Sequence, residues 1–371
     1  MLKNLIINRK FLKQLDFGLI ITALIISLFG VMNIYSCTYK SYGVYYLEHQ
    51  LVWILLGLIV MYLIISIDYS LFGSYSKIIY GLGIISLLFV DVFGNIVGGA
   101  RSWVGIGSRG IQPSEFMKIA AIILVAKMIN DFEGKINVPK NLIKLIGVVL
   151  LPMVLIVIQP DMGMTMVFFF IFLGVFYAAG LDSKVILGGF LATVIVILIL
   201  WKSGVLQIYQ MGRIFGFLNP DQYELTYAYQ ATQSQIGIGS GGILGKGFLK
   251  GTYVSSGFIP EISTDYIYAV VGEEWGLLGG LGLIFFYGLL IFKMINIGKS
   301  SKDLFGQMMV TGVITTFLFL ILQNIGMTIG IMPVTGVTLP FMSYGGSSIL
   351  TSFISIGIVL NVGMRRKKIN F

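Results

Sequence analysis

The sequence predicts an all-α polytopic membrane protein with about ten transmembrane helices, forming a single integral membrane domain over residues 1–371. Two observations support this fold class. Of the 371 residues, 57% are hydrophobic and 11% are charged, whereas about a quarter of the residues in a soluble domain are charged. The hydrophobic residues also fall in runs that approach the roughly 20 residues a helix needs to cross a bilayer.

The predicted spans are apolar runs of about 16 to 25 residues with few charges inside them. An even number of spans places both termini on one side of the membrane. The first run lacks a small-residue cleavage site, which favours a retained helix over a signal peptide. The runs lie near residues 17–36, 50–67, 78–94, 113–129, 142–158, 162–180, 185–201, 266–292, 306–328 and 346–363.

Basic residues flank alternate connections between the spans. By the positive-inside rule, these connections and both termini are cytoplasmic, and the protein is a multi-pass protein of the cytoplasmic (inner) membrane. The segments at 94–112 and 202–265 are then outside. The second of these is a long extracytoplasmic loop between helices 7 and 8, and its length and polarity predict that it is the catalytic loop. The basic flanks are Lys3, Arg9, Lys10 and Lys13; Lys127, Lys135, Lys140 and Lys144; Lys293, Lys299 and Lys302; and residues 365–368.

Composition excludes several other classes of function. The formal net charge is +9, but most basic residues lie in the cytoplasmic flanks, where topology and anionic headgroups account for them, so we expect no nucleic-acid partner. Cys37 and His49 are the only residues of their types. The chain therefore has no cysteine or histidine metal cluster and no His-based triad.

Glycines recur in the long outer loop. Gly237, Gly239 and Gly242 fit the pattern G-x-G-x-x-G, but a dinucleotide site also needs a βαβ unit, which this sequence does not contain. One interpretation is a compact loop or short re-entrant element whose N–H groups approach an anionic headgroup beside Lys246. The alternative is close packing of small residues against neighbouring helices.

Charged residues inside the spans are costly and need partners or a polar cavity. Glu115 and Lys118 stand at i, i+3 in the fourth span and can pair on one helix face. Such a pair either fixes helix packing or tunes a nearby cavity. Glu273 and Glu274 lie about 12 to 14 Å below the outer end of the eighth span, and Lys118 lies about 9 Å below that of its own span. We therefore expect that one of these glutamates can reach Lys118.

Asp265 lies at the outer boundary of the eighth span, in its predicted first turn, after a Ser263-Thr264 pair able to cap the helix. It is either a carboxylate that interacts with the helix dipole or a general base whose pKa is raised by partial burial. Glu261 either supports this site or binds a divalent cation. Asp161 follows Pro160 and is interpreted as a helix N-cap.

The chain contains several sequence motifs in a fixed order. They are Gln112-Pro-Ser-Glu-Phe-Met-Lys118, Gln159-Pro-Asp161, Gln233-Ser234 with Ile238-Gly-Ser-Gly-Gly242, Pro260-Glu261 with Thr264-Asp265, Gly272-Glu-Glu274 and Pro340-Phe-Met-Ser-Tyr-Gly-Gly-Ser-Ser348. These motifs resemble those of the SEDS proteins (shape, elongation, division and sporulation), and the resemblance runs from the first span to the last. Within the family, Gly99 to Trp103 and Gly245 to Thr252 are most similar to the elongation branch, RodA, while the division and sporulation branches, FtsW and SpoVE, remain alternatives.

The resemblance implies a peptidoglycan glycosyltransferase that polymerises lipid II on the outer membrane face during cell elongation. Asp265 would deprotonate the GlcNAc 4-hydroxyl of an acceptor, whose oxygen attacks C1 of MurNAc and expels undecaprenyl pyrophosphate with inversion. Glu261, Glu115, Lys118, Glu273 and Glu274 would support the site. Basic groups would stabilise the pyrophosphate, with Arg101 and Lys246 as first choices and Arg213 and Lys250 as further candidates. A divalent cation, Mg or Mn, is an open alternative.

The resemblance also implies partners. A class B penicillin-binding protein would supply crosslinking, because the chain has no soluble transpeptidase domain, and other membrane proteins of the elongation complex are expected. A scaffold role for such a partner is compatible with catalysis. The main rival function is a lipid II flippase, but transporters carry their binding groups near the bilayer midplane, commonly on interrupted helices. Here the polar residues concentrate in the outer loops.

Overall fold

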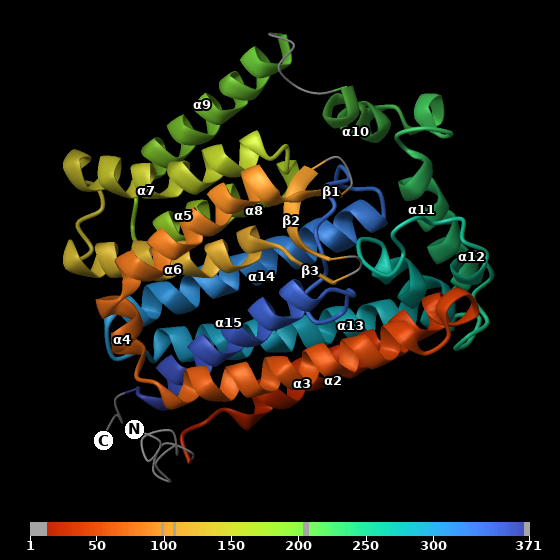
Figure 1. Ribbon diagram of the computed structural model, residues 1–371, viewed down its shortest axis with the longest axis horizontal. Helices are drawn as coiled ribbons and strands as arrows, with labels where there is room; N and C mark the ends of the chain where they lie inside the picture. Colours follow the sequence, from red (N-terminus) through yellow and green to blue (C-terminus); the bar gives the residue numbers. More distant parts are fainter. Residues whose placement is uncertain (1–12, 98–99, 107–108, 203–207, 367–371) are drawn as a thin grey trace.

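The computed structural model describes residues 13–97, 100–106, 109–202 and 208–366, and almost all of its regular structure is helical (Figure 1). Its longest helices run roughly along a common direction. They are α2 (Phe17–Tyr42), α3 (Tyr45–Ser66), α5 (Ser76–Phe93), α6 (Pro113–Asp131), α7 (Pro139–Ile158), α8 (Met162–Ala178), α9 (Ser183–Lys202), α13 (Ile267–Lys299), α14 (Leu304–Thr328) and α15 (Gly346–Met364).

Each of the ten predicted spans overlaps one of these helices. Among the described residues, seven helices are long and apolar enough to cross a membrane. The other three are α6, α8 and α9, and the crossing of the membrane by these helices stays a prediction. Helix α8 has 17 residues, whereas α6 carries Glu115, Lys118 and Lys127 and is mostly buried by protein. The fold class, an all-helical multi-pass membrane protein, is confirmed.

Except for α4, which lies between α3 and α5, the shorter elements are in the two segments predicted to be outside. Residues 94–112 contain a small antiparallel sheet in the order β1-β2-β3, which the all-α expectation did not include. The sheet lies with α10–α12 at the end of the bundle opposite α4 (Figure 1). Open sheet edges are tolerated only outside the hydrocarbon region, which agrees with an outer position. The shorter elements are α4 (Tyr69–Ser74), β1 (Asn95–Val97), β2 (Ala100–Ile106), β3 (Arg109–Ile111), α10 (Ile208–Leu218), η2 (Pro220–Tyr223), α11 (Tyr229–Gly241) and α12 (Thr252–Ser255).

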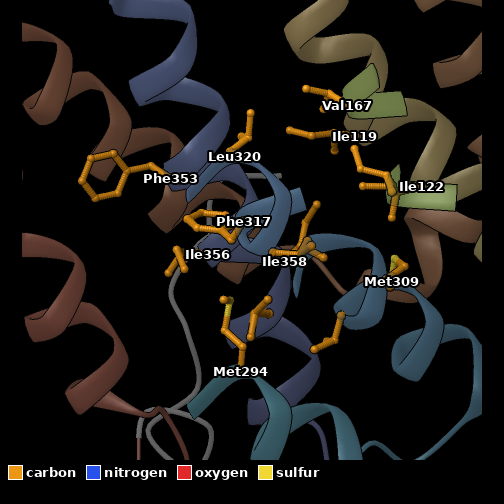
Figure 2. Packing of buried hydrophobic residues seen from close by; sticks show 14 of the residues in the cluster. Ile119, Ile122, Val167, Met294, Met309, Phe317, Leu320, Phe353, Ile356 and Ile358 are labelled. Atoms are coloured by element: carbon orange, nitrogen blue, oxygen red, sulfur yellow. The ribbon is translucent and has the colours of Figure 1, made fainter. Parts of the chain in front are cut away.

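The hydrophobic core lies around α14 and α15. Figure 2 shows Phe317 of α14 and Phe353 of α15 in one cluster of buried side chains with residues from α6, α8 and α13, including Ile122, Val167 and Met294. By contrast, α3, α5, α7 and α9 carry many exposed leucine, isoleucine and valine side chains. That surface matches lipid, since a bilayer is as apolar as these side chains.

The eighth span is interrupted, which corrects the expectation of one continuous helix. Gly276 has non-helical backbone angles (φ 65°, ψ −162°) inside α13. The segment 242–247 enters this break. Its N–H groups at Lys246 and Gly247 donate to the carbonyls of Glu273 and Glu274, and the N–H of Leu277 donates to the carbonyl of Gly242. The polar backbone groups freed by the break are thus satisfied by protein, as membrane depth requires.

The glycine-rich sequence before this segment is helical rather than a loop. It forms α11, which packs along α13. A Cβ atom placed on Gly241 would lie 2.1 Å from the carbonyl oxygen of Gly272, and one on Gly245 would lie 2.2 Å from that of Glu274. Close backbone packing therefore accounts for Gly241 and Gly245. It does not account for the three glycines of the predicted pattern: a Cβ atom on Gly239 or Gly242 would meet no described atom within 4 Å, and one on Gly237 would make only ordinary van der Waals contact.

Candidate functional site

The sequence predicted Asp265 in the first turn of the helix. In the structure it lies just before α13. Tyr266 is the N-cap residue, and its side chain makes no capping bond. Asp265 instead ends a tight turn in which its N–H donates to the carbonyl of Glu261, 3.0 Å away. Glu261 has a positive φ of 54°. The turn ends before the N-cap residue of α13, and Asp265 is half-buried there.

The backbone around Asp265 is held by α14 and by the connection between α14 and α15. The Asn324 side-chain amide donates to the carbonyls of Asp265 and Val337, each at 2.8 Å. The Tyr344 N–H donates to the carbonyl of Ser263 at 2.8 Å, and the Ser343 hydroxyl donates to that of Thr264. These bonds use only the main chain of the turn. They therefore hold the Asp265 carboxyl group in place while leaving it available for chemistry.

Arg213 and Asp265 lie next to the same glycine. A Cβ atom on Gly336 would be 3.3 Å from Asp265 Oδ2 and 3.7 Å from both terminal nitrogens of Arg213. Gly336 also has a positive φ of 73°, which favours glycine at this position. The α14–α15 connection thus passes beside the Asp265 carboxyl group at the start of α13 and the Arg213 guanidinium of α10.

Asp161 belongs to the same polar group. It is the N-cap of α8, as predicted, because its Oδ1 accepts from the Met164 N–H at 3.0 Å. Its Oδ2 accepts from the Gln112 side-chain amide at 3.1 Å. The charge of Arg213 acts on both Asp161 and Asp265. The sequence motif Gln159-Pro-Asp161 singled out this aspartate, but nothing in the sequence placed it beside Arg213.

The surroundings raise the pKa of Asp265 to about 6, chiefly through burial and next through the nearby Glu261 carboxylate. The positive charge of Arg213 and a hydrogen bond from Thr264 oppose this rise. Burial also raises the pKa of Asp161 above its ordinary value. A carboxyl group with a pKa near 6 is a better proton acceptor than an ordinary aspartate and is still mostly ionised at neutral pH.

Glu115 and Lys118 make the predicted contact within α6. Lys118 Nζ lies 2.9 Å from Glu115 Oε1, and both side chains are buried. Glu115 Oε2 accepts from the Thr351 hydroxyl of α15 at 2.8 Å. At the start of α6, the Gln112 N–H donates to the Ser347 hydroxyl at 3.0 Å. The pair therefore joins α6 to α15 beneath the site.

Neither Glu273 nor Glu274 reaches Lys118, which makes that expectation wrong. Glu273 Oε1 forms a 2.6 Å ion pair with Lys246, and its carboxylate also accepts N–H groups from α12. Glu274 Oε1 accepts from the Ser36 hydroxyl of α2 and, at 3.4 Å, from the N–H of Gly251. The face of α13 that carries these acids packs against α2, α11 and α12, and the Lys246–Glu273 ion pair and the hydrogen bonds of both acids join α13 to neighbouring segments.

The structure also changes the order of the predicted pyrophosphate ligands. Lys246, a first choice, is already paired with Glu273, and its ammonium lies 5.6 Å from the centre of the Tyr253 ring. Arg101, the other first choice, donates to the carbonyl of Asp91 at 3.1 Å, near the end of α5. Lys250 is exposed. Of the four candidates, Arg213 is the one whose guanidinium the structure places beside Asp265.

A metal site made by protein alone has no support within the described ranges. No group of three or more His, Cys, Asp or Glu side chains there converges as such a site requires. Magnesium bound through substrate phosphates needs only one or two carboxylates. The charge of Arg213 acts on Asp161 and Asp265. A divalent cation, bound with Glu261 or bridging the pyrophosphate, stays a prediction.

Comparison with known proteins gives consistent matches over the full length. The family model for FtsW, RodA and SpoVE, described as a cell cycle protein, matches residues 16–368. The chain is 31% identical to the peptidoglycan glycosyltransferase RodA of Treponema pallidum, with 95% of this chain and 98% of that protein covered. It is 34% identical to the peptidoglycan glycosyltransferase MrdB of Escherichia coli K12 (96% and 95% covered). It is also 32% identical to the stage V sporulation protein E of Bacillus subtilis (94% and 96% covered).

Solved structures agree with these matches. One similar chain comes from a peptidoglycan synthase complex studied for the coordination of polymerization and crosslinking, with a TM-score of 0.82, 28% identity, and 95% of this chain and 99% of that chain covered. Another is the rod shape determining protein RodA of Thermus thermophilus, with a TM-score of 0.72, 26% identity, and 95% and 98% covered.

Proposed function

This chain belongs to the SEDS family of FtsW, RodA and SpoVE and is a peptidoglycan glycosyltransferase, and on that premise we propose that Asp265 is the general base of its sugar transfer. The observation that carries the proposal is the position of the Asp265 carboxyl group. Its backbone is fixed by three connections to the α14–α15 segment, its pKa is raised to about 6, and a guanidinium lies beside it.

The proposed substrate is lipid II. Asp265 accepts the proton of the GlcNAc 4-hydroxyl as that oxygen bonds to C1 of the MurNAc of the growing chain. The bond from C1 to the pyrophosphate oxygen breaks, and undecaprenyl pyrophosphate leaves with inversion at C1. Negative charge grows on the leaving group, so a fixed cation lowers the barrier most when it lies near that group. Arg213 is the proposed cation. Glu261 and the Glu115–Lys118 pair would position the turn and α6.

The first prediction concerns the pH dependence of polymerisation. Because only the ionised form of Asp265 accepts a proton, kcat/KM should be nearly constant above about pH 7 and fall about tenfold per pH unit below pH 6. An ordinary aspartate would place this fall near pH 4. Initial rates of lipid II polymerisation between pH 4.5 and 8, with the fold monitored by circular dichroism, measure it. A rate that stays constant down to pH 5 would contradict the raised pKa.

The second prediction concerns Arg213. Replacement by Gln removes a positive charge that lowers the pKa of Asp265, so the acid limb should move to higher pH and the rate at pH 7 should fall about tenfold. Arg213→Lys should keep part of the activity, because it keeps the charge and loses the fork geometry. Lys250→Gln is the matched control, since it also removes an outer-loop charge. A loss for Lys250→Gln as large as that for Arg213→Gln would indicate general charge attraction.

Within the family, the proposed role is in cell elongation. The sequence blocks most similar to RodA and the matches to RodA and MrdB support it, while the match to a sporulation protein keeps the other branch as the alternative. Expression in cells depleted of their own elongation or division enzyme tests the assignment. Restored rod shape is expected, and rescue of division alone would overturn it.

The proposed partner is a class B penicillin-binding protein, and both termini of this chain are proposed to be cytoplasmic. The similarity to a chain of a peptidoglycan synthase complex supports the partner. The basic flanks support the orientation. Cysteine labelling at positions near α4, compared with positions in β2, tests the orientation from either side of the membrane.

A lipid II flippase is the rival function, and the break in α13 is the feature that favours it, because transporters bind substrates at interrupted helices. Here protein backbone from residues 242–247 fills the break. Incubation of the purified protein with labelled lipid II, alone and with the partner enzyme, separates the two functions. We expect glycan ladders. Translocation of lipid without polymer would identify a flippase.

A further inference from the structure

A cavity of about 540 Å³ lies between α5, α6 and α7, at the end of the bundle away from Asp265. Its volume is in the range of small-molecule sites. Its position excludes a direct part in the sugar transfer proposed above. Its lining residues are Lys77, Tyr80, Leu124, Met128, Asp131, Phe132, Lys144, Gly147, Val148 and Leu151.

The polar and apolar parts of this cavity are separated along the helix axes. Lys77 is in the first turn of α5, Lys144 is in the second turn of α7, and Asp131 is the last residue of α6. All three therefore lie at the same end. Leu124 is seven residues from Asp131 in α6, and Leu151 is seven residues from Lys144 in α7. Both leucines therefore lie about 10 Å further from that end. The cavity thus has a charged mouth and an apolar interior.

The mouth is positively charged. Asp131 forms a 2.6 Å ion pair with Lys127, which offsets its charge. Over the ranges that the structure describes, neither Lys77 nor Lys144 forms an ion pair. The Lys144 ammonium lies 5.9 Å from the centre of the Phe132 ring, an arrangement that holds it at the mouth. Two lysines are then available to a negatively charged group.

The side of the cavity is open where α7 carries a glycine. A Cβ atom on Gly147 would meet no other atom within 4 Å, and the neighbouring Leu151 is about half exposed, at 48%. A molecule that lies in the membrane can therefore enter from the side without displacing a helix. The Tyr80 hydroxyl donates to the carbonyl of Val148 at 2.7 Å, which ties α5 to α7 at the back of the opening.

We infer that this cavity binds an anionic phospholipid, with the headgroup phosphate between Lys77 and Lys144 and an acyl chain against Leu124 and Leu151. Basic pockets between transmembrane helices at the predicted cytoplasmic end suit such headgroups. A free phosphate would use the lysines but not the apolar interior, whereas a neutral lipid would use the interior but not the lysines. The combination of both surfaces selects the anionic lipid.

The test compares lipid binding by full-length variants in detergent. Native mass spectrometry and the midpoint of thermal unfolding are measured with phosphatidylglycerol, with phosphatidylcholine and with inorganic phosphate. We expect phosphatidylglycerol to bind the wild-type protein and raise its Tm, and the other two to have little effect. Lys77→Gln with Lys144→Gln should weaken phosphatidylglycerol binding about tenfold or more.

Two further variants separate the cavity from general charge attraction. Lys140→Gln with Lys184→Gln removes the same charge from exposed positions at the same end, and neither residue lines the cavity. This control should bind phosphatidylglycerol like the wild type. Gly147→Leu should fill the opening and abolish binding with both lysines intact, and it should not weaken the helix, because leucine is the better helix former.

Three results would each overturn the inference. They are an equal loss of binding in the control pair, unchanged binding by Gly147→Leu, and stabilisation by inorganic phosphate as strong as that by phosphatidylglycerol. The first would show diffuse attraction to the membrane surface, the second would place the lipid elsewhere, and the third would identify a phosphate site. None of these measurements depends on glycan synthesis, so they remain valid whatever the role of Asp265.

Discussion

Asp265→Asn is expected to lower the rate of glycan polymerisation by at least about 10²-fold. The substitution keeps the size of the side chain and removes its ability to accept a proton. The turn should keep its shape, because the hydrogen bonds from Asn324 and Tyr344 use main-chain carbonyl groups of residues 263–265. Thermal unfolding should therefore be close to that of the wild type. Initial rates with labelled lipid II, together with Tm, measure both effects.

Asp161→Asn is the comparison for this prediction. Asp161 caps α8 and accepts from Gln112. Asn is about as good an N-cap as Asp, so the loss of stability should come from the bond to Gln112 and amount to about 1 kcal/mol. Its effect on the rate should be smaller than that of Asp265→Asn. If the Asp265→Asn protein makes long glycan at a near wild-type rate, Asp265 is not the base, and Asp161 becomes the next carboxyl group to test.

Removing Lys118 is expected to cause the largest loss of stability. Lys118→Met leaves the buried Glu115 carboxylate without its cation, and breaking a buried pair in this way costs about 3 to 5 kcal/mol. The double variant Glu115→Gln with Lys118→Met should recover part of that loss, because no charge is then left unpaired. The Thr351 hydroxyl, which donates to Glu115 Oε2, can donate to the side-chain oxygen of Gln as well.

A double-mutant cycle measures this coupling. Thermal unfolding in detergent gives the change in stability for Glu115→Gln, for Lys118→Met and for the double variant. The interaction energy between the two positions should be about 1 to 3 kcal/mol. Lys127→Met, which breaks the partly exposed pair with Asp131, should cost no more than about 1 kcal/mol. Simple additivity of the Glu115 and Lys118 changes would exclude direct coupling between them.

Local features of the site could be predicted from the sequence, because each depends on residues close together in the chain. The Glu115–Lys118 contact follows from i, i+3 spacing on one helix, and the Asp161 cap follows from the residues at the start of α8. The prediction for Asp265 was right about the boundary of α13 and wrong about its first turn. The turn at Glu261 moved it outside α13, and no propensity rule foresees a positive φ at a glutamate.

Contacts between distant segments were predicted less well. Equal depth in the membrane suggested that Glu273 or Glu274 meets Lys118, but depth fixes only one coordinate, and the rotation of α13 directs these acids towards α2 and α12. Lys246 was expected to be available to a phosphate because it is a basic residue of the long loop. It pairs instead with Glu273, because the segment 242–247 enters the break in α13. The sequence of either segment alone does not reveal that contact.

The sequence by itself determined the membrane fold and the ten helical segments, because the burial of apolar side chains acts along the chain. The family followed from the order of its motifs. The tertiary structure alone decided which side chains meet. Asp265, Arg213 and Asp161 come from three segments, and the α14–α15 connection with Gly336 brings two of them together. Their shared electrostatics arises from distances across the bundle, which no local pattern encodes.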